Sequence, residues 1–276
     1  MLSSSGNAGA SAAAYAARAG LAAWVFAPAS APRSKLAQIM AAGARLVPVN
    51  GNTSDCCRLA RTAAARFGWV NVTTTYYNPV GVDAYATVAY EIAGLRPDVA
   101  LLPISSGPLL ASVMKGFERL KRLGLADKLP RPVAVQPSAC SPTVRAFETG
   151  KPVAPWTHQP TAASALNDTL AGYESDGDYT LTWIRRHSGA AVAVSDDEIL
   201  EAARVLATRE GIFVEPSAAA PIAAIGRLMA SGWLKPDERV VAVATGHGLK
   251  DAPDAVLPEM QKPIDPDEAA LAKLLE

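Results

Sequence analysis

Hydrophobic and polar positions in the first fifty residues alternate between two kinds of segment. Small helix-forming residues run from Ala10 to Ala19 and stop at Gly20, and a short apolar run follows from Ala22 to Phe26. The same order recurs, with a helix expected from Ser34 to about Ala42 and a strand from Arg45 to Val49. Helix and strand alternating at this spacing predict a parallel α/β sheet.

A third cycle and the turn residues after it suggest where the chain divides. A helix is expected near Asp55 to Phe67 and a strand around Trp69 to Thr73, ahead of the turn residues Asn78-Pro79-Val80-Gly81. We therefore predict a small α/β domain over residues 1–78 and a large α/β domain over residues 79–276.

The large domain has a strand and helix pattern of its own. Buried strands are predicted at Val99 to Pro103, at Pro132 to Gln136 and at Arg239 to Ala244. Ser195 and Glu198 have the spacing of a capping box, which predicts that a helix begins there. The fold class expected from the whole pattern is α/β with two open parallel sheets.

Two stretches of the large domain have little periodicity. Residues 142–178 are rich in Pro, Thr, Ser, Gly and Asp, which predicts long loops and short helices at the mouth of a site. The tail from Ala252 carries several prolines and acidic residues and is expected to be a surface helix or partly disordered.

Charge and cysteine usage narrow the functional classes. The 276 residues carry 26 basic and 26 acidic side chains without a basic block, so nothing favours nucleic acid or an anionic membrane as a partner. The three cysteines, Cys56, Cys57 and Cys140, have no metal-binding spacing and fit the reducing cytoplasm. No apolar run is long enough to span a bilayer.

Three turns rich in small and hydroxyl residues are candidates for ligand binding. The first, Ser4-Ser5-Gly6-Asn7, precedes a helix, whose free N–H groups and positive dipole end suit a carboxylate or phosphate. A plain helix cap would have the same composition. The second, Ser105-Ser106-Gly107-Pro108, follows a buried strand and is either a phosphate-binding turn or an ordinary strand-to-helix connection.

The third turn follows the last predicted strand and reads Thr245-Gly246-His247-Gly248-Leu249-Lys250-Asp251. A threonine hydroxyl at a strand end can hydrogen-bond a neutral ring nitrogen. The alternative is a glycine-rich turn with an exposed histidine. In open α/β sheets all such turns lie at the carboxyl edge, where ligands bind.

These turns, in this order, resemble the threonine synthase group of fold-type II pyridoxal-phosphate (PLP) enzymes, which have the tryptophan synthase β-like fold. The other matching stretches are Ala14-Tyr15-Ala16-Ala17-Arg18-Ala19-Gly20, Gly43-Ala44, Tyr77-Asn78-Pro79 and Glu210-Gly211-Ile212-Phe213-Val214-Glu215-Pro216-Ser217-Ala218-Ala219. The resemblance covers nearly the whole chain and implies two three-layer parallel-sheet domains, with PLP as the cofactor.

The resemblance also implies roles for individual residues. Asn7 is expected at the phenolic oxygen of PLP, Thr245 at the pyridine nitrogen, and Glu215 near the ring. The phosphate is expected on the turn formed by Ser105, Ser106, Gly107 and Leu109, although this turn has fewer glycines than is usual in the family. The substrate carboxylate is expected on Ser4, Ser5 and Gly6.

The Schiff-base lysine of the family is not found at a matching position. It is expected in a Ser-x-Lys-Asp-Arg-like segment ahead of the Ser-Gly-Asn turn, which here begins at residue 4. None of the nine lysines has that context: Lys35, Lys115, Lys121, Lys128, Lys151, Lys235, Lys250, Lys262 and Lys273. We therefore expect no catalytic lysine in this chain, a small domain that is incomplete, and a sequence that is an N-terminally truncated form of a PLP enzyme.

The function implied is that of a PLP-dependent lyase of amino-acid metabolism. The expected chemistry is elimination or replacement on a small amino acid or on O-phosphohomoserine, with this chain itself inactive. The alternatives are a threonine or serine dehydratase-like lyase, a gene fragment, and a non-catalytic protein that binds PLP or an amino acid. A homodimer is implied by the family alone.

Overall fold

The structure is a computed structural model that describes residues 1–157 and 159–251. Its strands are β1 (Leu2–Ser3), β2 (Trp24–Pro28), β3 (Arg45–Val49), β4 (Val99–Pro103), β5 (Arg131–Pro137), β6 (Ala190–Val194) and β7 (Val240–Ala242). Its α-helices are α1 (Asn7–Arg18), α2 (Arg33–Ala41), α3 (Thr53–Phe67), α4 (Pro79–Ala84), α5 (Ala86–Ile92), α6 (Pro108–Arg122), α7 (Pro142–Thr149), α8 (Glu174–Arg186), α9 (Asp196–Glu210) and α10 (Pro216–Ala230).

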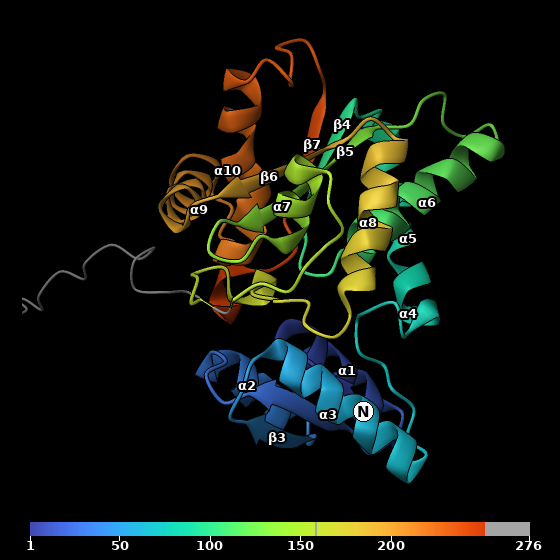
Figure 1. The fold of residues 1–276 in the computed structure, drawn as a ribbon, viewed down its shortest axis with the longest axis vertical. Helices are drawn as coiled ribbons and strands as arrows, with labels where there is room; N and C mark the ends of the chain where they lie inside the picture. Colours follow the sequence, from blue (N-terminus) through green and yellow to red (C-terminus); the bar gives the residue numbers. More distant parts are fainter. Residues whose placement is uncertain (158, 252–276) are drawn as a thin grey trace, which may run out of the picture.

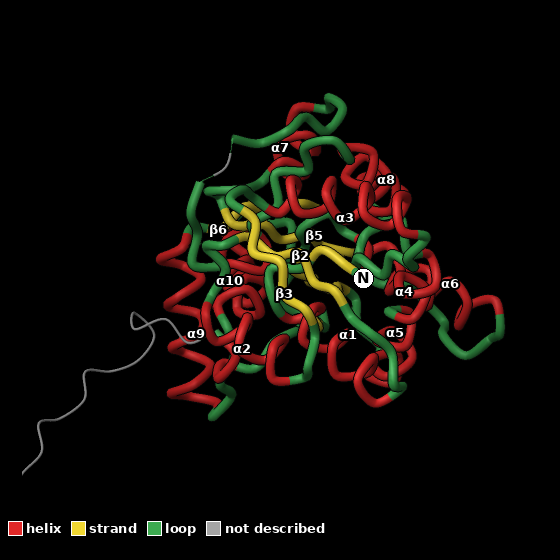
Figure 2. Tube along the Cα trace, turned by 90° about the horizontal axis from the view of Figure 1, so that it is seen from below, coloured by secondary structure: helices red, strands yellow, loops and turns green. Residues whose placement is uncertain are grey.

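The first part of the chain forms a three-stranded parallel sheet in the order β1-β2-β3. Helices α1 and α2 contact each other on one face, and α3 packs against β1 and β2 on the other (Figure 2). Leu2, Ala13, Val25 and Ile39 are buried together at the centre. This layer lies below the rest of the chain in Figure 1.

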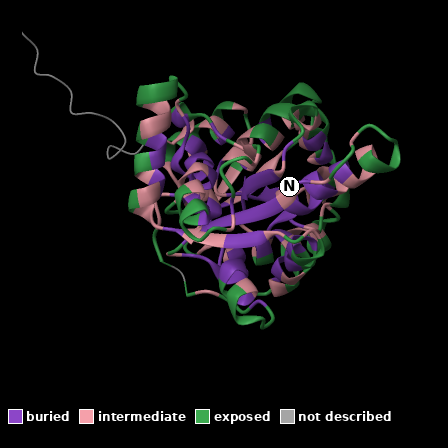
Figure 3. Cartoon of the chain, turned by 90° about the horizontal axis from the view of Figure 1, so that it is seen from above, coloured by how far each residue is buried: buried purple, intermediate pink, exposed green. Residues whose placement is uncertain are grey.

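The second part forms a four-stranded parallel sheet in the order β6-β5-β4-β7. Successive side chains of a strand point to opposite faces, so β4 contributes to two cores. Val99 and Leu101 pack with α9 and α10, whereas Ala100 and Leu102 pack with α6 and α8. Figure 3 shows the strands buried at the centre and the exposed residues on the outer helices.

Most of the expected elements are confirmed. The parallel α/β class is present in both sheets, and Ser195 and Glu198 form the predicted capping box at the start of α9. The division at residue 78 stays a prediction, although α4 does begin at Pro79. The expected tail from Ala252 lies outside the described residues.

One expected strand is wrong, and two elements of the structure were not expected. The strand expected at Trp69 to Thr73 is wrong, because this segment makes only isolated bonds to the chain start, including Met1 N to Val70 O at 2.8 Å. Helix α8 was not expected, because its buried face includes the polar Asp176 and Thr180, which weaken the apolar periodicity. Strand β6 was also missed, because alanine has a low strand propensity.

A buried ion pair joins the two layers. Lys35 of α2 reaches Glu215, the residue before α10, with 3.1 Å between its Nζ and Glu215 Oε2. The same amine lies 2.8 Å from Asp251 Oδ2 and donates to Ser164 Oγ at 2.9 Å. The side chains of Lys35 and Glu215 are both 1% exposed, so each charge depends on the other for stabilisation.

We predict that Lys35→Met destabilises the protein by about 3–5 kcal/mol, because it leaves two carboxylates without their cation. Urea unfolding followed by circular dichroism measures this. The matched control is Lys128→Met, which removes a half-exposed lysine paired with Asp98 and should cost about 1 kcal/mol or less. Equal losses in the two variants would contradict the assignment of Lys35 as the joining residue.

A second link between the layers generates a prediction about pH. The backbone N–H of Tyr76 donates to Asp176 Oδ2 at 3.3 Å, and burial raises the pKa of Asp176 to about 6. From about pH 4 to pH 6 the unfolded chain loses this proton while the folded chain keeps it, so this group lowers stability as pH rises.

Asp176→Asn should therefore raise the free energy of unfolding at pH 7 by about 1 kcal/mol, because the amide carries no charge to desolvate. At pH 4 the variant and the natural protein should unfold at the same temperature. Thermal unfolding at the two pH values measures the difference. A variant that loses stability at pH 7 would show that the ionised carboxylate is favourable at this position.

Candidate active site

One cavity of about 690 Å³ lies where the carboxyl ends of the two sheets meet. Its lining includes the loop after β1, the loop after β4 and the loop after β7, so strands from both layers point at it. This is the edge at which open α/β sheets bind ligands, and the volume is within the range of small-molecule sites.

The cavity brings together eight of the nine residues expected to bind cofactor or substrate. These are Ser4, Ser5, Asn7, Ser105, Ser106, Gly107, Leu109 and Thr245. The ninth, Gly6, does not line the cavity, because it packs on Lys35: a Cβ on Gly6 would lie 2.4 Å from Lys35 Cδ. The individual roles of these residues stay predictions.

The first turn is shaped by Ser4. Its Oγ accepts hydrogen bonds from Gly6 N at 3.1 Å and Gly9 N at 2.8 Å, which folds the chain into the start of α1. Ser4 therefore occupies the N–H of Gly9, the third residue of α1, and leaves the N–H groups of Asn7 and Ala8 for a ligand. The hydroxyl proton of Ser4 is also free to be donated, because its oxygen acts as acceptor in both bonds.

Asn7 is fixed by Glu215. Its Nδ2 donates to Glu215 Oε1 at 2.6 Å, while Asn7 Oδ1 is buried and has no partner among the described residues. Glu215 can approach this closely because Gly246 has no side chain: a Cβ there would lie 2.2 Å from Glu215 Oε1. The other carboxylate oxygen of Glu215 pairs with Lys35, so Glu215 connects α2 with Asn7.

The second turn opens at the start of α6. Gly107 has φ +104°, and a Cβ there would lie 2.0 Å from Thr180 Oγ1, so only glycine fits. Thr180 Oγ1 donates to Ser106 O, and Gln136 Nε2 donates to Ser105 O, which hold the turn in place. No side chain caps the 15-residue helix, so its N–H groups and dipole face the cavity.

The third turn and residues 165–168, which lie between α7 and α8, also line the cavity. Thr245 is exposed at the end of β7, while His247 Nδ1 accepts from Leu249 N at 3.1 Å and is a local hydrogen-bonding residue. Asp168 was missed by sequence analysis, because a lone acidic residue in a loop carries no motif. It lines the cavity and is 4% exposed.

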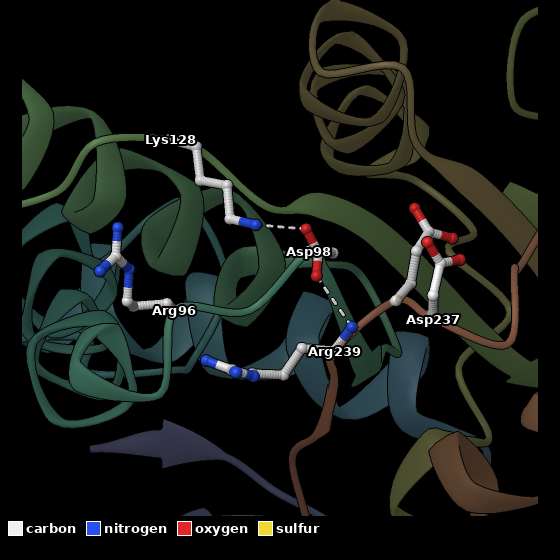
Figure 4. Close-up of a pocket in the computed structure, with 6 residues that line it drawn as sticks. Arg96, Asp98, Lys128, Asp237 and Arg239 are labelled. Carbon is white, nitrogen blue, oxygen red and sulfur yellow. Dashed lines mark hydrogen bonds and ion pairs between the residues drawn. The ribbon is translucent and has the colours of Figure 1, made fainter.

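A second pocket of about 600 Å³ lies on the opposite edge of the large sheet (Figure 4). It is lined by Arg96, Asp98, Lys128, Asp237, Glu238 and Arg239. Asp98 is already bonded to Lys128 and to the backbone N–H of Arg239. Because Asp98 already has these partners and the pocket lies at the amino ends of β4 and β7, we place the active site in the other cavity.

Within the described residues, no helix combines the length and the apolar character needed to cross a membrane. No group of three or more His, Cys, Asp or Glu side chains in the same residues is placed to hold a metal ion.

Comparisons with known proteins agree with this geometry. A family model for pyridoxal-phosphate dependent enzymes matches residues 1–246. The threonine synthase of Mycobacterium tuberculosis is 37% identical over 274 residues, covering 96% of this chain and 73% of that protein. The threonine synthase of Methanocaldococcus jannaschii is 35% identical over 267 residues, covering 95% of this chain and 64% of that protein.

Solved structures show the same fold. A threonine deaminase from T.th. has a TM-score of 0.71 at 25% identity, covering 90% of this chain and 76% of that chain. Maize serine racemase has a TM-score of 0.73 at 20% identity, covering 99% of this chain and 75% of that chain, and supports the fold alone.

The residues present fit the cofactor. The uncapped start of α6 suits its phosphate, and the cavity is also lined by Asn7 and Thr75, whose Oδ1 and Oγ1 atoms have no hydrogen-bond partner among the described residues. The family resemblance, the tryptophan synthase β-like fold, PLP as cofactor and the class of PLP-dependent lyases are thereby confirmed. The chain belongs to the family of pyridoxal-phosphate dependent enzymes and is a relative of the threonine synthases.

Proposed function

We propose that this cavity binds PLP together with a small amino acid, for elimination or replacement on that amino acid as in a threonine synthase-like lyase. The observation that carries the proposal is the convergence of Asn7, Ser106 and Thr245 on one cavity, although they come from loops far apart in the sequence. When bound, PLP supplies an electron sink that weakens the bonds at the α-carbon of the amino acid.

The proposed positions of the cofactor groups follow from the chemistry of the lining. The phosphate belongs at the start of α6, on the N–H groups of the Ser105 to Leu109 turn. The Thr245 hydroxyl is suited to an uncharged ring nitrogen, because it can donate without transferring its proton. Asn7 is suited to the phenolic oxygen, because Glu215 takes one N–H of its amide and leaves the other for a ligand.

The substrate carboxylate is proposed to bind at the start of α1. Ser4 and Ser5 line the cavity there, and the helix offers the N–H groups of its first two residues and its positive dipole end. The two anions would then occupy separate helix starts, the carboxylate at α1 and the phosphate at α6.

A catalytic amine is the group that the described residues do not provide. No lysine side chain among residues 1–157 and 159–251 lines the cavity, and the buried Lys35 is held by Glu215 and Asp251. A positioned acid–base group contributes roughly 10²–10⁴-fold to a rate. We therefore propose that this chain by itself binds the cofactor without a covalent bond and does not turn substrate over.

This same observation favours a second candidate, a non-catalytic protein that binds PLP or an amino acid. The two candidates share the binding residues and differ only in whether the amine is supplied. A serine or threonine dehydratase-like lyase uses the same site and differs only in its substrate. The cytoplasm is proposed as the compartment, because the three cysteines are free and buried. A homodimer stays a prediction.

We predict that the purified chain binds PLP in a saturable way but is not labelled by it. Titration of PLP, followed by quenching of tryptophan fluorescence, should give a single site per chain. Borohydride treatment of the saturated protein should leave no pyridoxyl group on Lys35 in an intact-mass and peptide-mass measurement. Stoichiometric labelling of any one lysine would contradict the non-covalent proposal, and absence of saturable binding would contradict the site.

Gly107→Ala should weaken PLP binding by about tenfold or more, because a methyl group would meet Thr180 and distort the phosphate turn. The matched control is Gly124→Ala, at the other end of α6. Gly124 also has positive φ, at +70°, but a Cβ there meets nothing within 4 Å. Both variants place an alanine at positive φ, but only Gly107→Ala lies at the phosphate turn and meets Thr180, so equal PLP affinities in the two variants would contradict the position of the phosphate.

A further inference from the structure

The segment between α3 and α4 connects the lower layer with the upper one and carries Tyr76 (Figure 1). Tyr76 is outside the lining of the cavity, and its ring packs edge-on against Tyr179 of α8, with 4.8 Å between the ring centroids. Its backbone N–H donates to Asp176 Oδ2, also of α8, at 3.3 Å. Two contacts with α8 therefore fix the place of Tyr76 before its hydroxyl group is considered.

The hydroxyl group of Tyr76 lies 3.1 Å from Thr180 Oγ1. Thr180 Oγ1 in turn lies 2.9 Å from two carbonyl oxygens, those of Ser106 and Asp176. A carbonyl can only accept, so the single proton of Thr180 is directed at these oxygens and Tyr76 is the donor to Thr180. Burial raises the pKa of Tyr76, which keeps that proton on its hydroxyl group. The hydrogen bonds thus run in one direction, from Tyr76 through Thr180 to Ser106.

The bond from Thr180 to the Ser106 carbonyl depends on this donation. Thr180 is fully buried and Ser106 is 1% exposed, so water has little access to replace a lost partner. Thr180 also has a competing acceptor, the Asp176 carbonyl four residues earlier in α8. A hydroxyl that accepts a hydrogen bond becomes a stronger donor. The Tyr76 hydroxyl therefore strengthens the bond that Thr180 makes to Ser106.

The Ser106 carbonyl sets the direction of a neighbouring N–H group. Ser106 and Gly107 share one peptide unit, and the described residues contain no cis peptide bond. In a planar trans peptide the C=O and N–H groups point in opposite directions. A carbonyl that is held toward Thr180 therefore holds the Gly107 N–H away from it, and Gly107 lines the cavity at the start of α6. This N–H belongs to the turn assigned to the cofactor phosphate.

We infer that Tyr76 is a positioning residue of the cofactor site, which acts through Thr180 to hold the peptide of Ser106 and Gly107 in the orientation that the phosphate needs. This inference rests on the proposed function and goes beyond it, because it ties phosphate binding to the segment that connects the two layers. The phosphate of a ligand should then depend on the Tyr76 hydroxyl, whereas the pyridine ring should not.

The test begins with Tyr76→Phe, which removes the hydroxyl group and keeps the ring that packs on Tyr179. PLP is titrated into the full chain by quenching of tryptophan fluorescence, and pyridoxine, which has the ring without the phosphate, is measured by its competition with PLP. The variant should bind PLP about threefold to tenfold more weakly, the effect of one buried hydrogen bond, and pyridoxine within about twofold of the natural chain. The control is Tyr179→Phe, which removes the same atom from a ring that is 39% exposed and should leave both affinities unchanged.

Variants of Thr180 separate the proposed path from a loss of packing. Thr180→Ser keeps the hydroxyl group and should retain PLP affinity within about threefold, whereas Thr180→Val lacks it and should weaken PLP binding by about tenfold or more. Once Thr180 is valine, Tyr76→Phe should cost no further PLP affinity, because the link to Ser106 is already broken. Additive losses in the double variant would contradict the path through Thr180. The comparison of Tyr76→Phe with the natural chain decides the inference even where Thr180→Val does not fold.

The outcomes separate the inference from the function on which it rests. An unchanged PLP affinity in Tyr76→Phe overturns the inference and leaves the proposed function standing. An equal loss of PLP and pyridoxine affinity also overturns it, because Tyr76 would then act on the whole cavity. If pyridoxine does not compete even in the natural chain, the phosphate carries the affinity and the loss or retention of PLP binding decides. A natural chain that does not bind PLP overturns the proposed function, and the inference fails with it.

Discussion

Two parallel sheets that direct their carboxyl ends at the same cavity are the constraint on which the rest of the structure depends. The loops that follow the strands of a parallel sheet all lie at its carboxyl edge. The turns after β1, β4 and β7 therefore line one cavity although they are far apart in the sequence. Two of these turns lead into α1 and α6, whose starts lie at the cavity and present free backbone N–H groups. The same topology therefore sets the position of the cavity and supplies the helix starts to which we assign the two anionic groups.

The buried charges around Glu215 connect this topology to the geometry of the cavity. Lys35 comes from one layer and Glu215 from the other, so the ion pair fixes the two sheets relative to each other. The second oxygen of Glu215 receives Asn7 Nδ2, which sets the orientation of an amide in the lining. Gly6 and Gly246 are small because Lys35 and Glu215, respectively, occupy the space where a side chain would be. A single network thus links the stability of the fold to the shape of its site.

Sequence analysis predicted the layers, most strands and the three turns that line the cavity, because these depend on local patterns. Apolar runs mark β2 and β4, and Gly107 is needed for a turn that the sequence places after a strand. It did not identify Asp168, which carries no motif, or the environment of Lys35, whose partners Ser164, Glu215 and Asp251 lie far from it in the sequence. Lys35 carries no motif, yet its burial follows from the glycine at residue 6 and the acid at residue 215. The alanine-rich strand β6 was missed because tertiary packing, rather than propensity, makes it a strand.

The most direct test of the central claim is a crystal structure of the chain grown with PLP. The account predicts one cofactor in the cavity, with its phosphate on the N–H groups at the start of α6, its phenolic oxygen at Asn7 and its ring nitrogen at Thr245. Density for the cofactor outside this cavity, or a phosphate bound away from the Ser105 to Leu109 turn, would contradict it.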